Sequence, residues 1–140
     1  MDPTRPADAA LDGPSPFSAG EEAYLRSQGL GRLASLDSSG APTVMPVGYR
    51  LGRDDAGVTV ITIGGFRLHE SAKYRNLARD QRYAFVVDDG IGPSARGVLV
   101  RGRATLMDDP QRASIRLLPE RVTSWGVDTP PFERQHRRVG

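Results

Sequence analysis

Residues 58–80 read VTVITIGGFRLHESAKYRNLARD, and the pattern changes twice within them. The first six residues are mostly β-branched, which favours a β-strand, and Gly64 and Gly65 end that strand. From about Ser71 to Arg79 the pattern predicts a short helix. Its inner face is expected to hold Tyr74, Leu77 and Ala78. No strand–helix rhythm of the βαβ kind runs along the chain, so a parallel Rossmann-type sheet is disfavoured.

The segment before this unit predicts a helix and two strands. Ser18 and Glu21 form a capping box, and Gly29 is placed to end the helix that follows them. Strands are then expected over residues 30–37 and 41–51, joined by the turn sequence DSSG. Because proline has no N–H for a ladder, Pro46 should lie at a sheet edge, at a bulge or where something other than a strand approaches.

The segment after the unit predicts two more strands and another helix. Residues 82–89 are expected to form a strand, and residues 96–109 a long one that its two glycines bend. Residues 109–118 (DPQRASIRLL) are interpreted as a helix that begins at Pro110, and residues 119–128 close the domain. About six strands with short turns and two or three short helices indicate a mainly β fold, a small antiparallel barrel.

Composition sets the outer limits. The chain has 140 residues, enough for one domain, and a net charge of only +2, which argues against an obligate nucleic-acid binder. It has no cysteine and only two histidines, so no metal site is expected. No apolar stretch is long enough to cross a membrane and the N-terminus is no signal peptide, so we expect a cytoplasmic protein without a membrane partner. The expected organisation is a disordered lead-in over residues 1–16, a folded domain over 17–128 and a loose basic tail over 129–140.

Lys73 is the only lysine among the nineteen Lys and Arg residues. It lies with Arg75 and Asn76 in the first turns of the predicted helix, directly after the strand that ends in Gly64 and Gly65. The first free N–H groups of a helix and the positive end of its dipole attract anions. The alternative is a solvated face of an amphipathic helix, and spacing alone favours that alternative.

Other candidates are weaker. Arg101 and Arg103 lie two residues apart on one strand and suit either an anionic ligand or a solvated face. Trp125 suits a core, a dimer interface or a pocket for a flat ring. No arrangement of nucleophile and base stands out, which indicates that the chemistry is supplied by a cofactor.

Taken in order over residues 17–128, several segments resemble the pyridoxamine-phosphate-oxidase-like split β-barrel superfamily. They are LGRLASLDSSGAPTVMPVGYRL, TIGG, SAKYRNLARDQRYAFVVDD, GVLVRGRATLMDDP and PERVTSWGVD. Within the superfamily they are most similar to the actinobacterial branch that uses the deazaflavin coenzyme F420. Asp80 and Gln81 stand where the family often has an Asn-Pro pair. The substrate residues of pyridoxamine-phosphate oxidases are not recognisable, so that activity is not expected.

The resemblance implies a split β-barrel homodimer with two cofactor sites at the subunit interface. It implies that the strand of Met45, Pro46, Val47 and Gly48 runs along the flavin-like ring. Ile61 and Thr62 would lie beside the ribityl phosphate, and Lys73, Arg75 and Asn76 would hold the phosphate. Trp125 would approach from the partner subunit.

The function expected on this basis is an oxidoreductase that moves a hydride between coenzyme F420 and a small organic acceptor. FMN is the nearest alternative cofactor, because both molecules share the ribityl phosphate. A non-enzymatic carrier of a flavin, a deazaflavin or haem is the alternative outside enzymes. No catalytic residue is assigned, although Tyr49 or His69 would suit a proton donor.

Overall fold

The computed structural model describes residues 14–109 and 112–139. The strand expected at residues 58–63 is β4 (Thr59–Ile63), and four of its five residues are buried. Burial is this complete because β4 pairs antiparallel with β3 (Arg50–Arg53) on one side and with β7 (Ser114–Trp125) on the other. The predicted strand is therefore confirmed, and it has a partner strand on each side.

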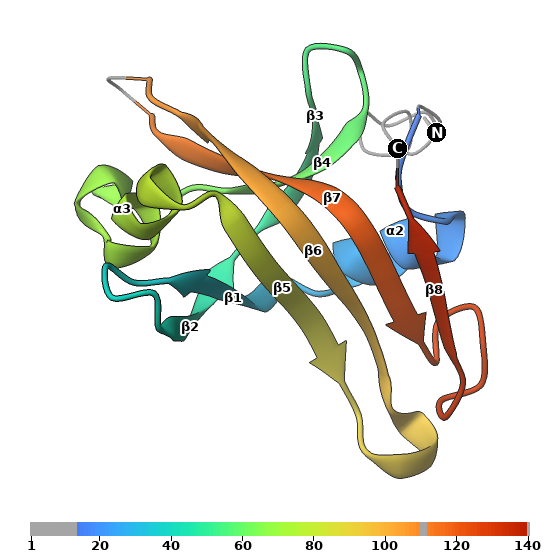
Figure 1. Ribbon diagram of the computed structural model, residues 1–140. Coiled ribbons are helices and arrows are strands. Elements are labelled where there is room, and N and C mark those ends of the chain that lie inside the picture. Colours follow the sequence, from blue (N-terminus) through green and yellow to red (C-terminus); the bar gives the residue numbers. More distant parts are fainter. Residues whose placement is uncertain (1–13, 110–111, 140) are drawn as a thin grey trace.

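The remaining strands belong to the same antiparallel sheet (Figure 1). They are β1 (Leu30–Leu36), β2 (Pro42–Gly48), β5 (Arg82–Asp89), β6 (Arg96–Met107) and β8 (Arg134–Arg138). The strand order is β2-β1-β5-β6-β7-β4-β3, with β8 paired to β7 outside that path. Within the described residues β2 and β3 stand at the two ends of the order and do not pair, so the barrel is split between them. The mainly β, antiparallel fold is confirmed, with eight strands in place of about six.

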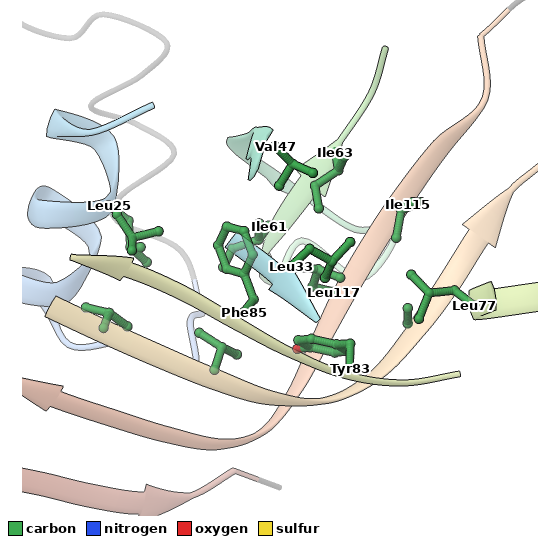
Figure 2. Close-up of a cluster of buried hydrophobic side chains, with 14 of the residues drawn as sticks. Leu25, Leu33, Val47, Ile61, Ile63, Leu77, Tyr83, Phe85, Ile115 and Leu117 are labelled. Atoms are coloured by element: carbon green, nitrogen blue, oxygen red, sulfur yellow. The ribbon is translucent and has the colours of Figure 1, made fainter. Parts of the chain in front are cut away.

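The interior of the barrel is one apolar cluster (Figure 2). Phe85 on β5 has no exposed surface, and its ring meets the Tyr49 ring edge-on at a centroid distance of 5.4 Å. Gly31 leaves room for the same ring, because a Cβ at that position would lie 2.4 Å from Phe85 Cζ. Burying a side chain of this size stabilises the fold by about 1.5–3 kcal/mol. The cluster holds the strands around the site at fixed positions.

Two α-helices pack against the strands and add Leu25 and Leu77 to the apolar cluster. The first, α2 (Ala19–Ser27), begins at the predicted capping box, where Ser18 and Glu21 exchange both hydrogen bonds. The second, α3 (Ala72–Arg79), begins at Ser71 as predicted and buries Leu77, but Ala78 is exposed and Asn76 is buried in its place. The short 3₁₀ segments η1 (Leu68–Glu70) and η2 (Gly92–Ser94) lie in the connections.

Two predicted backbone features are confirmed. Pro46 lies on β2, which has β1 as its one partner among the described strands and is therefore an edge strand. The long strand β6 has a register shift against β7 between Arg101 and Gly102. A Cβ on Gly102 would lie 2.1 Å from the Leu118 carbonyl oxygen, so only glycine fits where the two backbones approach each other.

The predicted helix from Pro110 is wrong. Residues 110–111 lie outside the described residues, and from Ser114 onward the chain is strand β7. Ile115 and Leu117 are both fully buried, an alternation of period two that points to a strand, and β4 and β6 pair with this segment on its two sides. The proline and the flanking polar residues resembled a helix start, but pairing on both sides prevailed over that local preference.

The predicted loose tail over residues 129–140 is also wrong, because residues 134–138 form β8 against β7. The guanidinium of Arg137 donates hydrogen bonds to the Pro16 carbonyl at 2.8 and 3.0 Å and forms an ion pair with the buried Glu21. Of the predicted lead-in over residues 1–16, residues 1–13 lie outside the described residues. The Pro14 carbonyl accepts a hydrogen bond from the Thr59 amide, so residues 14–16 lie against the barrel.

Candidate functional site

A cleft of about 700 Å³ opens at the end of β4, between that strand, the end of β2 and the start of β7. The cleft is lined by residues 48–50, by Thr62 and residues 64–69, and by Arg112 and Ala113. Arg50 and Thr62 are directly opposite each other in the β3–β4 ladder, so the sheet itself sets their spacing. The cleft is large enough for a cofactor ring system or a small organic substrate.

The segment between β4 and α3 forms the rim of this cleft. Gly65 has φ of 153° and Arg67 has φ of 57°, both in the region that favours glycine. This path leaves Phe66 with 93% of its surface exposed at the mouth of the cleft. An apolar ring held in solvent beside a cavity is a ready contact for a planar ligand.

Three arginines give the cleft its positive charge. Arg67 is held by Glu70 through two hydrogen bonds of 2.5 and 2.7 Å, and this contact lowers the pKa of the Glu70 carboxyl below its usual value. Across residues 14–109 and 112–139, no side chain forms an ion pair with Arg50 or Arg112. Their guanidinium groups are free to bind an anion, and each presents the fork that matches two oxygens.

Lys73 lies in the first turn of α3, four residues after His69 of the cleft rim. It is half-buried, and no residue of the described part of the chain forms a hydrogen bond or ion pair with its ammonium. The Ser71 side chain caps the Tyr74 amide at 3.3 Å. The backbone N–H groups before Tyr74 in the first turn of α3, together with the Lys73 ammonium, make this end of the helix positive. A positive helix end attracts phosphate.

The other residues expected at the phosphate have local partners. Arg75 donates to the Glu70 carbonyl oxygen at 2.6 Å. Asn76 is buried and donates from Nδ2 to Ser35 Oγ at 3.3 Å, which joins α3 to β1. On β4, Thr62 lines the cleft while the Ile61 side chain is fully buried in the core. Of the residues expected at the cofactor, Gly48 and Thr62 therefore line the cleft. Lys73 lies four residues along the chain from His69 on the cleft rim.

The strand expected along the ring is half open. Val47 points into the core, whereas Met45 is 55% exposed and Pro46 and Gly48 are exposed. Val44 is also exposed, at 61%. An edge strand with this many uncovered apolar side chains provides a surface against which a flat ring could lie.

Trp125 lies at the far end of β7 from the cleft. Ala113 lines the cleft, and the twelve residues from there to Trp125 correspond to roughly 40 Å of extended chain. In its own chain Trp125 packs over Gly97, where a Cβ would lie 2.4 Å from the indole ring, and carries the Arg134 guanidinium 5.9 Å from its ring centroid. It cannot reach the cleft of its own chain.

Of the two expected proton donors, His69 is the better placed. The Tyr49 hydroxyl donates to the Leu25 carbonyl at 2.5 Å, and burial raises the pKa of Tyr49 to about 12. His69 lies on the cleft rim with its side chain 45% exposed, 3.8 Å from Asp108 and edge-on to the Tyr74 ring. Tyr49 therefore supports the barrel, while the His69 imidazole is open to the cleft.

The sequence pattern did not single out Arg50, Phe66, Arg67 or Arg112. Nothing in the sequence distinguishes Arg67 from the other seventeen arginines, and Arg50 lies inside an expected strand. Phe66 carried the one usable indication, an aromatic residue directly after a glycine pair at a strand end. No cluster of His, Cys, Asp or Glu among the described residues could hold a metal, and no described helix is long and apolar enough to cross a membrane.

Residues 20–139 match the family described as pyridoxamine 5'-phosphate oxidase. The chain belongs to the pyridoxamine 5'-phosphate oxidase family. It is 34% identical over 124 residues to the 5a,11a-dehydrotetracycline/5a,11a-dehydrooxytetracycline reductase of Streptomyces rimosus, a match that covers 81% of this chain and 85% of that reductase.

Solved structures of low identity share the fold of this family member. A conserved hypothetical protein from Mycobacterium tuberculosis superposes with a TM-score of 0.68 at 22% identity, covering 89% of this chain and 92% of the other. A structure described as an F420 reductase superposes with a TM-score of 0.61 at 21% identity, covering 76% of this chain and 98% of the other. These likenesses confirm the split-barrel fold of the pyridoxamine 5'-phosphate oxidase family.

Proposed function

We propose that this protein is a reductase that transfers a hydride from reduced coenzyme F420 to a small organic acceptor. The observation that carries the proposal is the cleft with free Arg50 and Arg112, whose rim residue His69 lies four residues before Lys73 in the chain. The chain is similar over most of its length to a 5a,11a-dehydrotetracycline/5a,11a-dehydrooxytetracycline reductase, which supports an oxidoreductase of this fold. The acceptor class that we infer is a conjugated, ring-containing molecule.

The residues present fit a phosphorylated cofactor with a flat ring. Lys73 and the start of α3 would hold the phosphate, and Arg50 with Arg112 would bind the negatively charged tail. Met45, Pro46 and Gly48 would lie along the ring, since they are exposed on an edge strand beside the cleft. Such a cofactor supplies the hydride, and the protein binds it, orients it and keeps water away from it.

FMN is the second cofactor that the site would accept, because both molecules present a ribityl phosphate to Lys73. The two differ in the tail, which is longer and more anionic in the deazaflavin. Arg50 and Arg112 have no described ion-pair partner and favour the more anionic molecule.

We propose that the protein is a homodimer, and the position of Trp125 supports this. Roughly 40 Å of extended chain separates the Trp125 indole from Ala113 of the cleft. The indole would therefore contact the cofactor only from a second subunit. The exposed apolar residues of β2 leave a surface that a second subunit would cover. We propose that each cofactor site combines the cleft of one chain with the Trp125 end of the other.

Within the chain, His69 is the group that we propose as proton donor to the acceptor. It lies on the cleft rim, 3.8 Å from Asp108, and imidazole is the side chain best suited to proton transfer near neutral pH. A proton delivered here would complete the reduction of a carbon–carbon double bond after hydride transfer.

Stopped-flow mixing of protein carrying the reduced cofactor with candidate enones and quinones tests the proposal. Reoxidation within seconds by at least one enone, slowed in His69→Ala, is the expected result. A bound cofactor that stays reduced for minutes with every acceptor would identify the protein as a carrier. Parallel runs with FMN and coenzyme F420 compare the two cofactors under the same conditions.

A further inference from the structure

Three arginines form a row across the outer face of the sheet. In the strand register, Arg121 on β7 lies directly opposite Arg101 on β6 and directly opposite Arg138 on β8. All three are exposed. Strands β6, β7 and β8 lie side by side at this level (Figure 1), so the three backbone positions fall within about 10 Å of each other.

The register shows that the row points away from the core. The next pair along the ladder, Val100 and Val122, is buried in the apolar cluster, so the arginines of the preceding pair point outward. On the outer face, Thr123 Oγ1 and His136 Nδ1 are 3.0 Å apart and form the next row. We call Arg101, Arg121 and Arg138 the arginine row.

The charges of the arginine row are not neutralised within the described part of the chain. Two arginines nearby on the same face do have acidic partners: Arg82 pairs with Asp80 at 2.7 Å, and Arg103 lies 3.7 Å from Glu120. No ion pair involves a member of the row among residues 14–109 and 112–139. Like charges directly opposite each other destabilise a sheet, so an anion that binds there would remove a repulsion.

The arginine row is separate from the cleft. Arg121 is eight residues along β7 from Ala113 of the cleft, which corresponds to about 26 Å, and it lies on the outer face of the sheet. Cofactor binding in the cleft of the same chain therefore does not account for it.

We propose that the arginine row binds an oligophosphate group. Each guanidinium fork matches two oxygens of a phosphate, and side chains rooted about 5 Å apart can converge on neighbouring phosphates of one molecule. A second copy related by a two-fold axis through this face would set the row against itself, which excludes direct self-pairing. The aromatic side chain nearest along β7, Trp125, already carries Arg134 on its ring, so stacked bases of a single-stranded nucleic acid find no platform there.

Thermal unfolding of the full chain at low salt tests the proposal, with inorganic tripolyphosphate as the probe and tetraglutamate at matched ionic strength as the charge control. Tripolyphosphate should raise the unfolding midpoint of the wild type, and tetraglutamate should raise it much less. Arg121→Gln should unfold at a higher temperature than wild type without ligand, because one repulsion is gone, and should bind tripolyphosphate at least tenfold more weakly. Arg82→Gln, which removes a charge already paired on the same face, should behave as wild type.

An unmoved midpoint, equal shifts with both probes, or equal losses in Arg121→Gln and Arg82→Gln would each overturn the proposal. Arg101→Gln serves as the second variant of the row, and light scattering of each variant shows whether subunit association has changed. Cofactor affinity measured on the same samples should stay at the wild-type value, so this proposal and the proposed function fail independently.

Discussion

The ion pair between Glu21 and Arg137 joins the first helix to the last strand, and its removal should destabilise the fold strongly. Glu21 is fully buried and accepts hydrogen bonds from Ser124 Oγ at 2.6 Å and from the Ser18 amide at 2.9 Å. The Arg137 guanidinium adds the ion pair and reaches the Pro16 carbonyl. Glu21→Ala would leave Arg137 and Ser124 without their acceptor, a change that costs about 3–5 kcal/mol for a buried pair.

That loss is a large part of the 5–15 kcal/mol that stabilises a typical domain. Urea unfolding followed by circular dichroism measures it, with Glu70→Ala as the matched control. Glu70 also forms a two-bond ion pair with an arginine, but on the exposed rim, where such pairs contribute about 0–1 kcal/mol. Equal losses in the two variants would refute the assignment of β8 and α2 to one buried network.

The ion pair between Glu21 and Arg137 also predicts how the free energy of unfolding depends on pH. Burial acts to raise the pKa of Glu21, but hydrogen bonds from Arg137, Ser124 and Ser18 outweigh burial and lower the pKa below its ordinary value of 4.5. A carboxyl with a lowered folded-state pKa stabilises the protein above its unfolded-state pKa, and that contribution is lost as the pH falls through the folded-state pKa. Between pH 5 and pH 3 the unfolding free energy of the wild type should therefore fall more steeply than that of Glu21→Gln.

Two further substitutions test how the barrel is built. Gly102→Ala would place a Cβ 2.1 Å from a backbone carbonyl oxygen, so the free energy of unfolding in urea should fall by about 1–3 kcal/mol; an unchanged value would contradict the close approach of β6 and β7. Tyr49→Phe loses the hydrogen bond to Leu25 and should destabilise the protein by about 1 kcal/mol while acceptor reduction continues. A selective loss of turnover in Tyr49→Phe would instead make Tyr49 the proton donor.

Local patterns predicted the elements that depend on neighbours in the chain. The capping box at Ser18, the β-branched strand β4 and the helix after Ser71 all formed where expected, because their determinants lie within a few residues. A sheet edge was one of the three places expected for Pro46, because proline has no N–H for a ladder, and Pro46 does lie on the edge strand β2.

Elements that depend on distant partners were missed. Strand β8 is rich in arginine and looked like a solvated tail, and its position depends on β7 and on Glu21, more than a hundred residues away. The start of β7 looked like a helix because its strand pattern appears only once β4 and β6 are known to flank it. Of the residues expected at the cofactor, Gly48 and Thr62 line the cleft, and their role there stays a prediction. The exposure of Phe66 at the cleft mouth depends on a backbone path that the sequence does not reveal.

Fluorescence titration of the purified protein with coenzyme F420 and FMN, repeated with Lys73→Ala, tests the central claim most directly. Removing a charge that contacts the phosphate should cost about 1.5–3 kcal/mol, which weakens affinity for both cofactors roughly ten- to a hundredfold. Arg79→Ala, at the other end of the same helix, should bind both cofactors as the wild type does. Equal affinity in wild type and Lys73→Ala for both cofactors would contradict the assignment of the phosphate to the start of α3.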